Sequence, residues 1–411
     1  MMSVLISGAS VAGPALAYWL RRHGFTVTVV ERAPRLREGG QAVDLRGSAR
    51  EVIERMGLLD EVRAHHTGVV GMSAVDRENR RLWNWGSELS GHSGGIIADL
   101  EILRADLGRI LFDASREGVE YLFDDSITAL REHPDGVDVT FAGGMSRTFD
   151  LVVGADGLHS NVRRLAFGPE PDFVRDQGFY KAIFATEADI PLAGWQLMYV
   201  MPGRRRASLY PVRGGRTRGM FFFAGPEIDY DRRDVTSQKH LVAGAMAGQG
   251  WQVPRMLESM WETTDFYFDR ESLVTIDHWS RGRVALLGDA AFGGSVGMGT
   301  SMAVVGAYVL AGELAAAGGD HVRAFARYRQ VLSGYVEANK KPMPGGKNLF
   351  LPKGRAMIWA GNQMTKLMLA GPWRSVLTGD LQGKAARVTL GDYADPAKLV
   401  DGRRRKEDAR Q

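Results

Sequence analysis

The sequence predicts an α/β protein with a Rossmann-like nucleotide-binding domain, a second, β-rich domain and a C-terminal helical segment. Three features of the 411 residues indicate this fold: a strand, glycine turn, helix and strand within the first 31 residues, strand-like texture from about 179 to 223, and helical spacing after 331. The length suits two or three domains, and 45% hydrophobic with 24% charged residues is typical of a globular chain.

The N-terminal unit consists of an apolar strand at 4–6, a helix at 11–22 and a second buried strand at 26–31. This is the βαβ order of a parallel sheet. A helix at 48–56 is expected next, with Ser48 as a residue that can cap it.

The remaining expected elements alternate between strand and helix spacing. On the middle strand of the expected meander, Val137, Val139 and Phe141 should share one face. In chain order the elements are two strands in 70–85, a helix at 104–117, an antiparallel meander over 127–153, strands at 181–186, 196–201, 208–212 and 220–223, helical spacing at 238–260, a strand at 284–287 and a long helix at 300–317.

Composition excludes several classes of site. The absence of Cys excludes disulfides, thiolate metal ligands and a cysteine nucleophile, and none of the nine His residues forms a metal-like cluster, so no metal is expected. The net charge is 52 − 48 = +4, and we interpret the basic tail at 401–411 as a solvated terminus rather than a nucleic-acid site.

No membrane association or secretion is expected. The apolar stretch at 302–319 contains Glu313 and is rich in Ala and Gly, which favours a packed core helix over a membrane span. The apolar stretch at 4–20 has no basic residue before it, so it is not predicted to be a signal peptide. A cytoplasmic location is expected.

The turn after the first strand carries the glycines of a dinucleotide site. Gly8 permits the tight turn and Gly13 allows close helix–strand packing, while Ser10 stands where glycine is usual. The helix N-terminus would face a pyrophosphate. Glu31 ends the second strand, 18 residues after Gly13, where a carboxylate can accept ribose hydroxyls. Together these features predict dinucleotide binding.

Two aspartates follow buried strands further along the chain. Asp156 lies in Asp-Gly-Leu-His-Ser-Asn-Val-Arg at 156–163, and Asp289 lies in Gly-Asp-Ala-Ala at 288–291. Ligands bind at the carboxyl ends of such strands. The alternative is that both aspartates only cap helices, and Ser160 is interpreted as a capping residue.

With these three motifs in this order, the chain resembles the class A flavoprotein monooxygenases, the family of para-hydroxybenzoate hydroxylase-like aromatic hydroxylases. The resemblance runs from about 4 to 314. It implies a discontinuous FAD-binding domain at 1–75, 97–175 and 272–333. It also implies a β-rich substrate domain at 76–96 and 176–271, before the C-terminal helical segment with its basic tail at 334–411.

The resemblance also assigns FAD-binding residues. Glu31, with Arg32 beside it, would hold the adenosine ribose, Asp289 would bind the ribityl chain, and Asp156 is associated with FAD and NADPH. The whole implied cofactor set is Gly8, Ser10, Gly13, Glu31, Arg32, Arg46, Arg104, Asp156, Asp289, Gly297, Gly299 and Thr300. The loop at 288–299 departs from the family pattern, since it is about two residues shorter and lacks the usual proline.

The implied activity is NAD(P)H- and O2-dependent hydroxylation of an aromatic or polyketide-like small molecule through a flavin C4a-hydroperoxide. Either NADPH or NADH is expected as co-substrate, bound transiently near basic residues such as Arg46 or Arg163, because no second glycine-rich βαβ unit is found. The alternatives are a flavin reductase, a Baeyer–Villiger oxygenase or epoxidase, a drug-inactivating oxygenase and a non-catalytic binding protein. A homodimer is a further expectation.

The substrate is expected between the flavin and the β-rich domain, with about half of that domain's aromatic residues lining the site. No catalytic residue is assigned, although Tyr210 and His278 are candidate hydrogen-bond acceptors or bases. Trp83-Asn84-Trp85 resembles a halogenase motif, but a strand with two aromatics on one face is the favoured interpretation.

Overall fold

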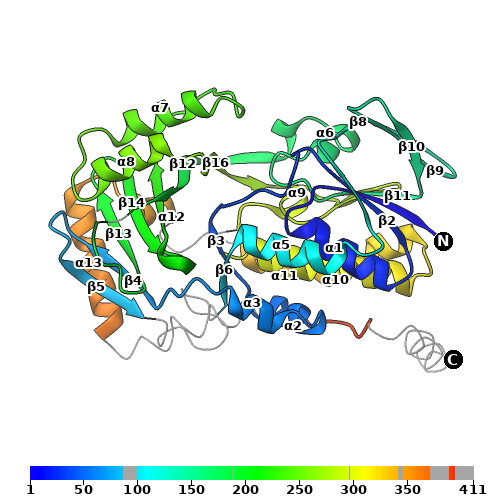
Figure 1. The fold of residues 1–411 in the computed structure, drawn as a ribbon, viewed down its shortest axis with the longest axis horizontal. Coiled ribbons are helices and arrows are strands. Elements are labelled where there is room, and N and C mark those ends of the chain that lie inside the picture. The colour runs from blue at the N-terminus through cyan, green and yellow to red at the C-terminus, as the bar shows by residue number, and fades with distance from the viewer. Residues whose placement is uncertain (87–99, 188, 296, 341–345, 371–387, 394–411) are drawn as a thin grey trace.

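The computed structural model describes residues 1–86, 100–187, 189–295, 297–340, 346–370 and 388–393. A mostly parallel sheet with its helices lies at one end of the molecule and a large, mostly antiparallel sheet lies at the other (Figure 1). The basic tail at 401–411 lies outside the described residues. The predicted α/β class, with a Rossmann-like part and a β-rich part, is confirmed.

The first sheet has six strands in the order β17-β18-β11-β1-β2-β7, all parallel except β17. Helices α1 (Ala12–Arg22), α5 (Arg104–Ser115), α10 (Gly299–Ala316) and α11 (His321–Lys340) gather on one side of it (Figure 1). The strands are β1 (Ser3–Ser7), β2 (Thr26–Glu31), β7 (Glu120–Phe123), β11 (Leu151–Gly154), β17 (Ser280–Arg281) and β18 (Val284–Leu286).

The second large sheet has seven strands in the order β16-β12-β15-β14-β13-β4-β5. Helices α7 (Val235–Met246) and α8 (Val253–Glu262) pack on one face over a core that includes Phe184, Phe221 and Met256. The strands are β4 (Gly71–Val75), β5 (Arg81–Gly86), β12 (Val174–Thr186), β13 (Trp195–Met201), β14 (Arg205–Pro211), β15 (Thr217–Phe223) and β16 (Phe266–Val274).

Smaller elements complete the described fold. The three-stranded sheet β10-β9-β8 accounts for most of the predicted meander, and Val137, Val139 and Phe141 are all buried on its middle strand as expected. The last residues of the expected meander, 151–153, belong instead to β11, a parallel strand of the first sheet. The elements are β8 (Ile127–His133), β9 (Gly136–Phe141), β10 (Ser146–Phe149), the ribbon β3 (Ala42–Asp44) with β6 (Glu101–Leu103), and helices α2 (Ser48–Arg55), α3 (Leu59–Ala64), α6 (Asn161–Ala166), α9 (Asp289–Phe292), α12 (Gly346–Phe350) and α13 (Arg355–Ala370).

The structure differs from the sequence-based expectations at several places. Helix α2 is not capped by Ser48, whose hydroxyl instead donates to the backbone oxygen of Val388, 340 residues away. The helical spacing at 238–260 belongs to two helices, α7 and α8, rather than one. Strand β16 was not anticipated, and β4 already belongs to the seven-stranded sheet, five residues before the expected boundary at 76.

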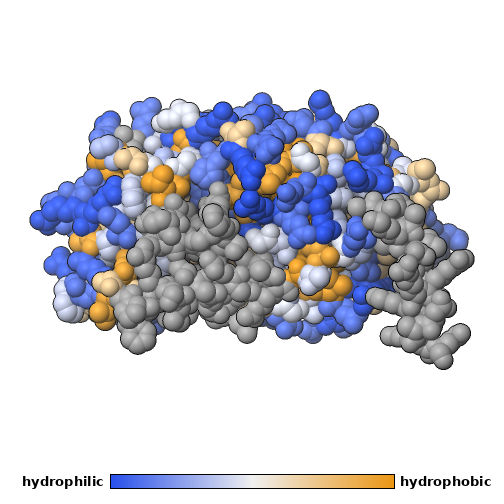
Figure 2. All heavy atoms as spheres, turned by 90° about the horizontal axis from the view of Figure 1, so that it is seen from below, coloured by the Kyte–Doolittle hydropathy of each residue, from blue (hydrophilic) through white to orange (hydrophobic). Residues whose placement is uncertain are grey.

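The apolar helix α10 is a core helix of this fold. By length and composition it could cross a membrane, but 72% of it is buried and it packs against α1, α2 and α11. The face in Figure 2 is mostly hydrophilic, with hydrophobic side chains in small separate groups between the atoms drawn in grey. The interpretation of 302–319 as a packed helix is therefore confirmed.

Candidate cofactor and substrate site

The first turn has no room for side chains at its two glycines. Gly8 adopts φ +107°, and a Cβ there would lie 2.6 Å from the backbone oxygen of Ala155. A Cβ on Gly13 would lie 1.9 Å from the backbone oxygen of Gly8. The close approach of β1, α1 and β11 therefore depends on both glycines, which leaves the N-terminus of α1 available for a phosphate.

Ser10 and Glu31 flank this turn. The exposed Ser10 accepts a hydrogen bond from Arg104 Nη1 at 3.0 Å, while Arg104 Nε is buried without a partner in the described residues. The Glu31 carboxylate accepts from the backbone N–H of Ala9 at 2.9 Å and of Ala33 at 3.0 Å. The turn, Glu31 and the N-terminus of α5 thus form one polar group, and Arg32 lies exposed beside it.

The Asp156 carboxylate accepts hydrogen bonds from four protein donors. It accepts from the backbone N–H groups of Asn161 at 2.9 Å and Val162 at 3.0 Å, and from the hydroxyls of Ser160 at 2.5 Å and Ser7 at 3.3 Å. Burial raises the pKa of Asp156 against the effect of these hydrogen bonds. The capping interpretation describes what this carboxylate does in the structure, and Ser160 caps α6 as expected.

Asp289 is different because its carboxylate has no hydrogen-bond partner among the described residues. It begins α9 without capping it, and it is exposed although the surrounding protein raises its pKa. Lys181 and Arg104 oppose that rise, so both cations lie near enough to act on Asp289. A Cβ on Gly299 would lie 3.4 Å from Asp289 Oδ1, which places the start of α10 beside it. Asp289 is therefore free to accept hydroxyls from a ligand.

The loop before α10 lies next to the β3–β6 ribbon. Gly297 has φ +77°, and a Cβ there would lie 3.7 Å from Asp44 Oδ2. Arg46 forms an ion pair with Asp44 at 2.7 Å, and its backbone N–H donates to Ser301. Gly297, Gly299 and Arg46 are thus brought together, with Thr300 in the first turn of α10.

Glu101 lies opposite Asp44 in the ribbon and was not singled out from the sequence. Burial and the charge of Asp44 raise the pKa of Glu101 to about 7, against the hydrogen bond from Thr67 and the charge of Arg46. This part of the candidate site therefore holds a carboxyl group that titrates near neutral pH.

Arg163 does not lie where a nicotinamide phosphate could reach it. Its side chain is fully buried, and its guanidinium donates to the backbone oxygens of Ala290 at 2.9 Å and Leu158 at 2.6 Å. The expectation that Arg163 contacts NAD(P)H is wrong for this reason. Arg163 instead ties the loop at 156–163 to α9.

A row of directly paired residues crosses the seven-stranded sheet on the face opposite α7 and α8. Register pairs Asp269 with Lys181, Lys181 with Phe222, and Phe222 with Arg206, and directly opposite residues share a face. Lys181 forms an ion pair with Glu271 at 2.7 Å. Strand β16, which carries Asp269 and Glu271, also packs against α9, so the row lies beside the helix that begins at Asp289.

Arg206 is the unusual member of this row. Its guanidinium carbon lies 4.5 Å from the ring centroid of Phe350 in α12, and that ring contacts Phe222 and Phe179. No hydrogen bond or ion pair joins Arg206 to another residue in the described part of the chain, and its Nε is buried. Burial lowers its pKa to about 10, so it remains a cation at neutral pH. Nothing in the sequence distinguishes Arg206 from its neighbours Arg204 and Arg205.

The aromatic residues of this sheet divide between its two faces. Tyr180, Phe221 and Phe223 pack in the core under α7 and α8, whereas Phe179 and Phe222 lie with Phe350 on the other face. Trp83 and Trp85 pack with Met72 and Leu369 as same-face strand residues. Trp83 also donates to Asn362 of α13 at 2.9 Å.

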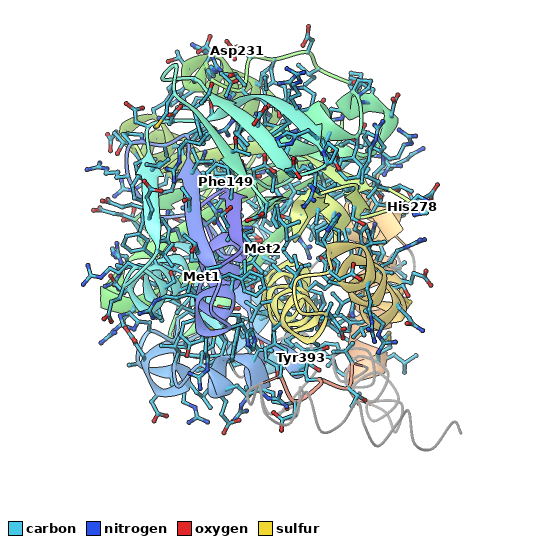
Figure 3. All side chains as sticks on the ribbon, turned by 90° about the vertical axis from the view of Figure 1, so that its right-hand side faces the viewer. Met1, Met2, Phe149, Asp231, His278 and Tyr393 are labelled. Atoms are coloured by element: carbon cyan, nitrogen blue, oxygen red, sulfur yellow. The ribbon has the colours of Figure 1, made fainter. Side chains whose placement is uncertain are left out.

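The two candidate bases do not suit that role. Tyr210 is buried, its hydroxyl accepts from the backbone N–H of Ala42, and burial raises its pKa far above neutrality. His278 lies at the surface, 3.1 Å from Arg329 Nη1 (Figure 3). Among the residues that the structure describes, no group of three or more His, Asp or Glu side chains is arranged to hold a metal ion.

Comparison with known proteins agrees with this geometry. The sequence matches the FAD binding domain family over residues 1–324. An uncharacterized protein of Mycobacterium tuberculosis is 47% identical over 355 residues, which cover 84% of this chain and 95% of the relative. A flavin-dependent monooxygenase of an unknown prokaryotic organism is 38% identical over 339 residues, covering 82% and 87%. The crystal structure of tetracycline destructase Tet(51) superimposes with a TM-score of 0.80 at 31% identity, covering 96% of this chain and 100% of that chain.

Proposed function

Because the chain belongs to the FAD-binding monooxygenases, we propose that it uses NAD(P)H and O2 to hydroxylate a planar aromatic or polyketide-like small molecule. It is an FAD-dependent oxidoreductase, so the alternative of a non-catalytic binding protein is not retained. When bound, FAD supplies the redox chemistry, and the protein supplies orientation and exclusion of water.

The described residues fit the pyrophosphate and the ribityl chain of FAD. Gly8 and Gly13 let β1, α1 and β11 approach closely and leave the N-terminus of α1 open for the pyrophosphate, and Asp289 offers an unused acceptor for ribityl hydroxyls. Asp156 acts indirectly, by holding the loop at 156–163. We propose that the direct contacts come from Gly8, Ser10, Gly13, Glu31, Arg32, Arg46, Arg104, Asp289, Gly297, Gly299 and Thr300.

The single observation that supports the substrate class is Arg206 beside Phe350. The Arg206 side chain is partly buried, with its Nε fully so, and a cation in that position without a counter-charge is costly, so an acidic or enolic oxygen of a ligand would stabilise it. The rings of Phe222 and Phe350 would contact a flat ligand at the same time. We therefore expect a planar substrate that carries an ionised or strongly polarised oxygen.

A second candidate function is inactivation of a planar drug. The relative of known structure at 31% identity is a tetracycline destructase, and a tetracycline has the required shape and acidic oxygens. Baeyer–Villiger oxygenation and epoxidation remain alternatives on the same scaffold, because the site and not the fold decides the product. The cytoplasmic location and the homodimer stay predictions.

Anaerobic bleaching of the FAD-loaded protein tests the proposed reaction. We expect NADPH or NADH to bleach the flavin, and we expect a panel of phenols, polycyclic quinones and tetracyclines to accelerate bleaching when a member fits the site. The measurement is the stopped-flow absorbance of the flavin for each nucleotide with and without each compound. No bleaching by either nucleotide would contradict the monooxygenase reaction. Equal bleaching rates with and without every compound would contradict the expectation that a bound substrate accelerates flavin reduction.

Arg206→Gln is expected to weaken binding of the fitting compound by about tenfold or more, because a charge-assisted hydrogen bond is lost from a buried position. FAD affinity should not change, since Arg206 lies on the sheet and not at the glycine turn. Titration of the flavin absorbance with the compound measures the effect. Arg216→Gln, on an exposed residue of the neighbouring hairpin, is the matched control. Equal affinity in the two variants would remove Arg206 from the substrate site.

A further inference from the structure

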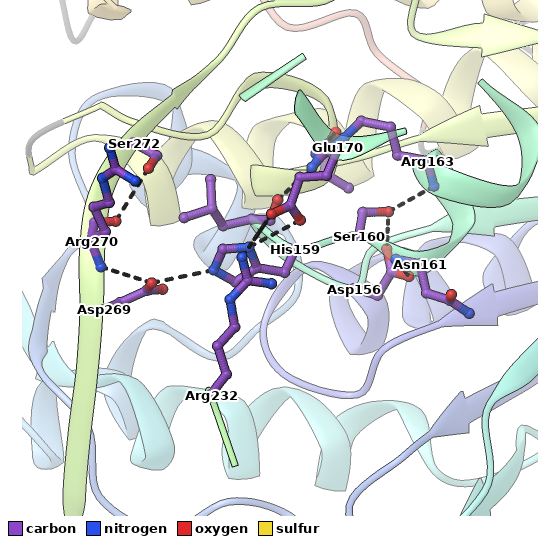
Figure 4. Close-up of polar contacts among 12 residues, drawn as sticks. Asp156, His159, Ser160, Asn161, Arg163, Glu170, Arg232, Asp269, Arg270 and Ser272 are labelled. Atoms are coloured by element: carbon purple, nitrogen blue, oxygen red, sulfur yellow. Dashed lines mark hydrogen bonds and ion pairs between the residues drawn. The ribbon is translucent and has the colours of Figure 1, made fainter. Parts of the chain in front are cut away.

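His159 connects two carboxylates that belong to different parts of the fold. Its Nδ1 lies 3.1 Å from both carboxylate oxygens of Glu170, and its Nε2 lies 3.2 Å from Asp269 Oδ1 (Figure 4). Glu170 follows the loop at 156–163, whereas Asp269 is on β16 of the seven-stranded sheet. We call Glu170, His159 and Asp269 the His159 bridge.

Both contacts of the His159 bridge can form only if each ring nitrogen carries a proton, which is one proton more than a neutral imidazole has. An ionised carboxylate only accepts hydrogen bonds, and a neutral imidazole has one N–H donor. Both nitrogens of His159 face carboxylate oxygens, so both contacts are hydrogen bonds only when the ring is an imidazolium. For two ionised carboxylates, this geometry therefore calls for a charged His159.

The groups around the bridge keep both carboxylates ionised. Arg232 donates to Glu170 at 2.7 Å, and Tyr230 and Tyr267 donate to Asp269 at 3.2 and 2.9 Å. Burial acts to raise the pKa of Glu170, but His159 and Arg232 outweigh it and hold that pKa at about 2. The pKa of Asp269 is likewise lowered against burial, by His159, Tyr267 and Lys181.

The imidazole itself responds to the same neighbours. Burial acts against its charge, but the hydrogen bonds and charges of Asp269 and Glu170 outweigh burial and raise the pKa of His159 above its usual 6.5. The other charged groups near the bridge are Arg163, whose charge interacts with Glu170 and Asp156, and Lys181, which faces Asp269 from β12. The carboxylates that touch the ring directly decide its charge.

The position of the bridge gives it a consequence for the candidate site. The loop at 156–163 is held to β1 by Asp156 and Ser7, and to α9 by Arg163 and Ala290. Asp269 begins the row of paired residues that continues through Lys181 and Phe222 to Arg206. His159 is therefore the charged link between the loop beside the cofactor residues and the strand that begins this row.

We propose that His159 is a positioning residue that remains an imidazolium at neutral pH and holds β16 against the loop at 156–163, and that its deprotonation releases one of the two carboxylates. The pKa of His159 is raised in the folded protein. The stabilisation that the charged ring provides is therefore complete below pH 6.5 and is lost as the pH rises through the raised pKa. The inference goes beyond the proposed reaction and does not depend on the identity of the substrate.

NMR titration of histidine-labelled, FAD-loaded protein in the absence of substrate tests the charge directly. The nine histidines give separate ring signals, and the one absent from His159→Gln belongs to His159. We expect a titration midpoint above 6.5, and a fall of roughly one pH unit or more in Asp269→Asn, where the facing charge is removed. A midpoint at or below 6.5, or one that Asp269→Asn leaves unchanged, would overturn the proposal. If His159→Gln does not fold, the signals that move in both Asp269→Asn and Glu170→Gln identify His159.

Thermal unfolding between pH 6 and 9 tests the stabilisation. We expect the melting temperature of the wild-type protein to fall by about 2 °C more than that of His159→Gln over this range, since one charge-assisted hydrogen bond is lost. His133→Gln is the matched control, because His133 lies 3.3 Å from Asp138 on an exposed hairpin and does not belong to the His159 bridge. The same pH dependence in wild type and His159→Gln would contradict the positioning role.

Discussion

Asp289→Ala is expected to yield a folded protein that binds FAD about ten- to a hundredfold more weakly. The Asp289 carboxylate makes no hydrogen bond to the described residues, so its removal leaves no protein donor unpaired. A ribityl hydroxyl of bound FAD would lose its acceptor, at a cost of about 1–3 kcal/mol for each unpaired group. Titration of apoprotein with FAD, followed by flavin fluorescence, measures the change.

Two other carboxylates provide the comparison for Asp289. Glu31→Ala should weaken FAD binding by a smaller factor, because the Glu31 carboxylate already accepts from the backbone N–H groups of Ala9 and Ala33 and has less acceptor capacity left for a ligand. Asp156→Ala should instead lower the unfolding temperature, since four donors from Ser7, Ser160, Asn161 and Val162 would lose their acceptor. Unchanged FAD affinity in Asp289→Ala would remove Asp289 from the cofactor site.

The sequence predicted the N-terminal unit well because its information is local. Strand β2 has the expected bounds, and Gly8 and Gly13 occupy positions that exclude any Cβ. Buried apolar strands and a tight turn are specified by residues close together in the chain. The glycine turn and the parallel pairing of β1 with β2 could therefore be anticipated, whereas β7 and β17 of the same sheet could not.

Strand β16 could not be anticipated because its charges are balanced by distant residues. It contains Asp269, Arg270 and Glu271 in succession, which is atypical of a buried strand. His159 contacts Asp269, Asp176 and Glu227 pair with Arg270, and Lys181 pairs with Glu271. Only the folded chain brings these partners together. Neither the charged strand nor the His159 bridge could therefore be predicted from the sequence.

The roles of Asp156 and Asp289 could likewise not be told apart from the sequence. Both follow a buried strand and precede a helix, so the sequence gives them equal standing as ligand contacts or caps. The structure separates them, because Asp156 has four protein donors and Asp289 has none among the described residues. The number of donors that reach a side chain is a tertiary property and cannot be read from spacing.

Tyr393 belongs to a C-terminal segment, 388–393, that packs on α2 and α10. Figure 3 places it at the opposite edge of the molecule from Asp231. Its ring lies on Gly312, where a Cβ would be 2.2 Å away, and its hydroxyl donates to the buried Glu313 at 2.6 Å. The backbone oxygen of Gly391 accepts from Tyr308 at 2.6 Å. This segment therefore braces the helices beside the parallel sheet.

Tyr393→Ala is expected to lower the free energy of unfolding by about 3–5 kcal/mol, because a large buried ring is removed and a cavity remains over Gly312. Tyr393→Phe keeps the ring but leaves Glu313 without its donor, and should lose about 1–3 kcal/mol. Urea unfolding of the FAD-loaded protein measures both values. Trp359→Ala, at a side chain that is 66% exposed, is the control and should change stability by less than about 0.5 kcal/mol.

Deletion of 371–411 removes the same brace. The variant also tests whether the C-terminal segment contacts the substrate entrance or a dimer partner. If 388–393 only braces α2 and α10, the deletion should destabilise the protein at least as much as Tyr393→Ala, while substrate affinity and oligomeric state at low temperature stay constant. A deletion variant as stable as the wild-type protein would contradict the brace. A change in substrate affinity or oligomeric state without loss of stability would assign the segment to the entrance or the dimer contact.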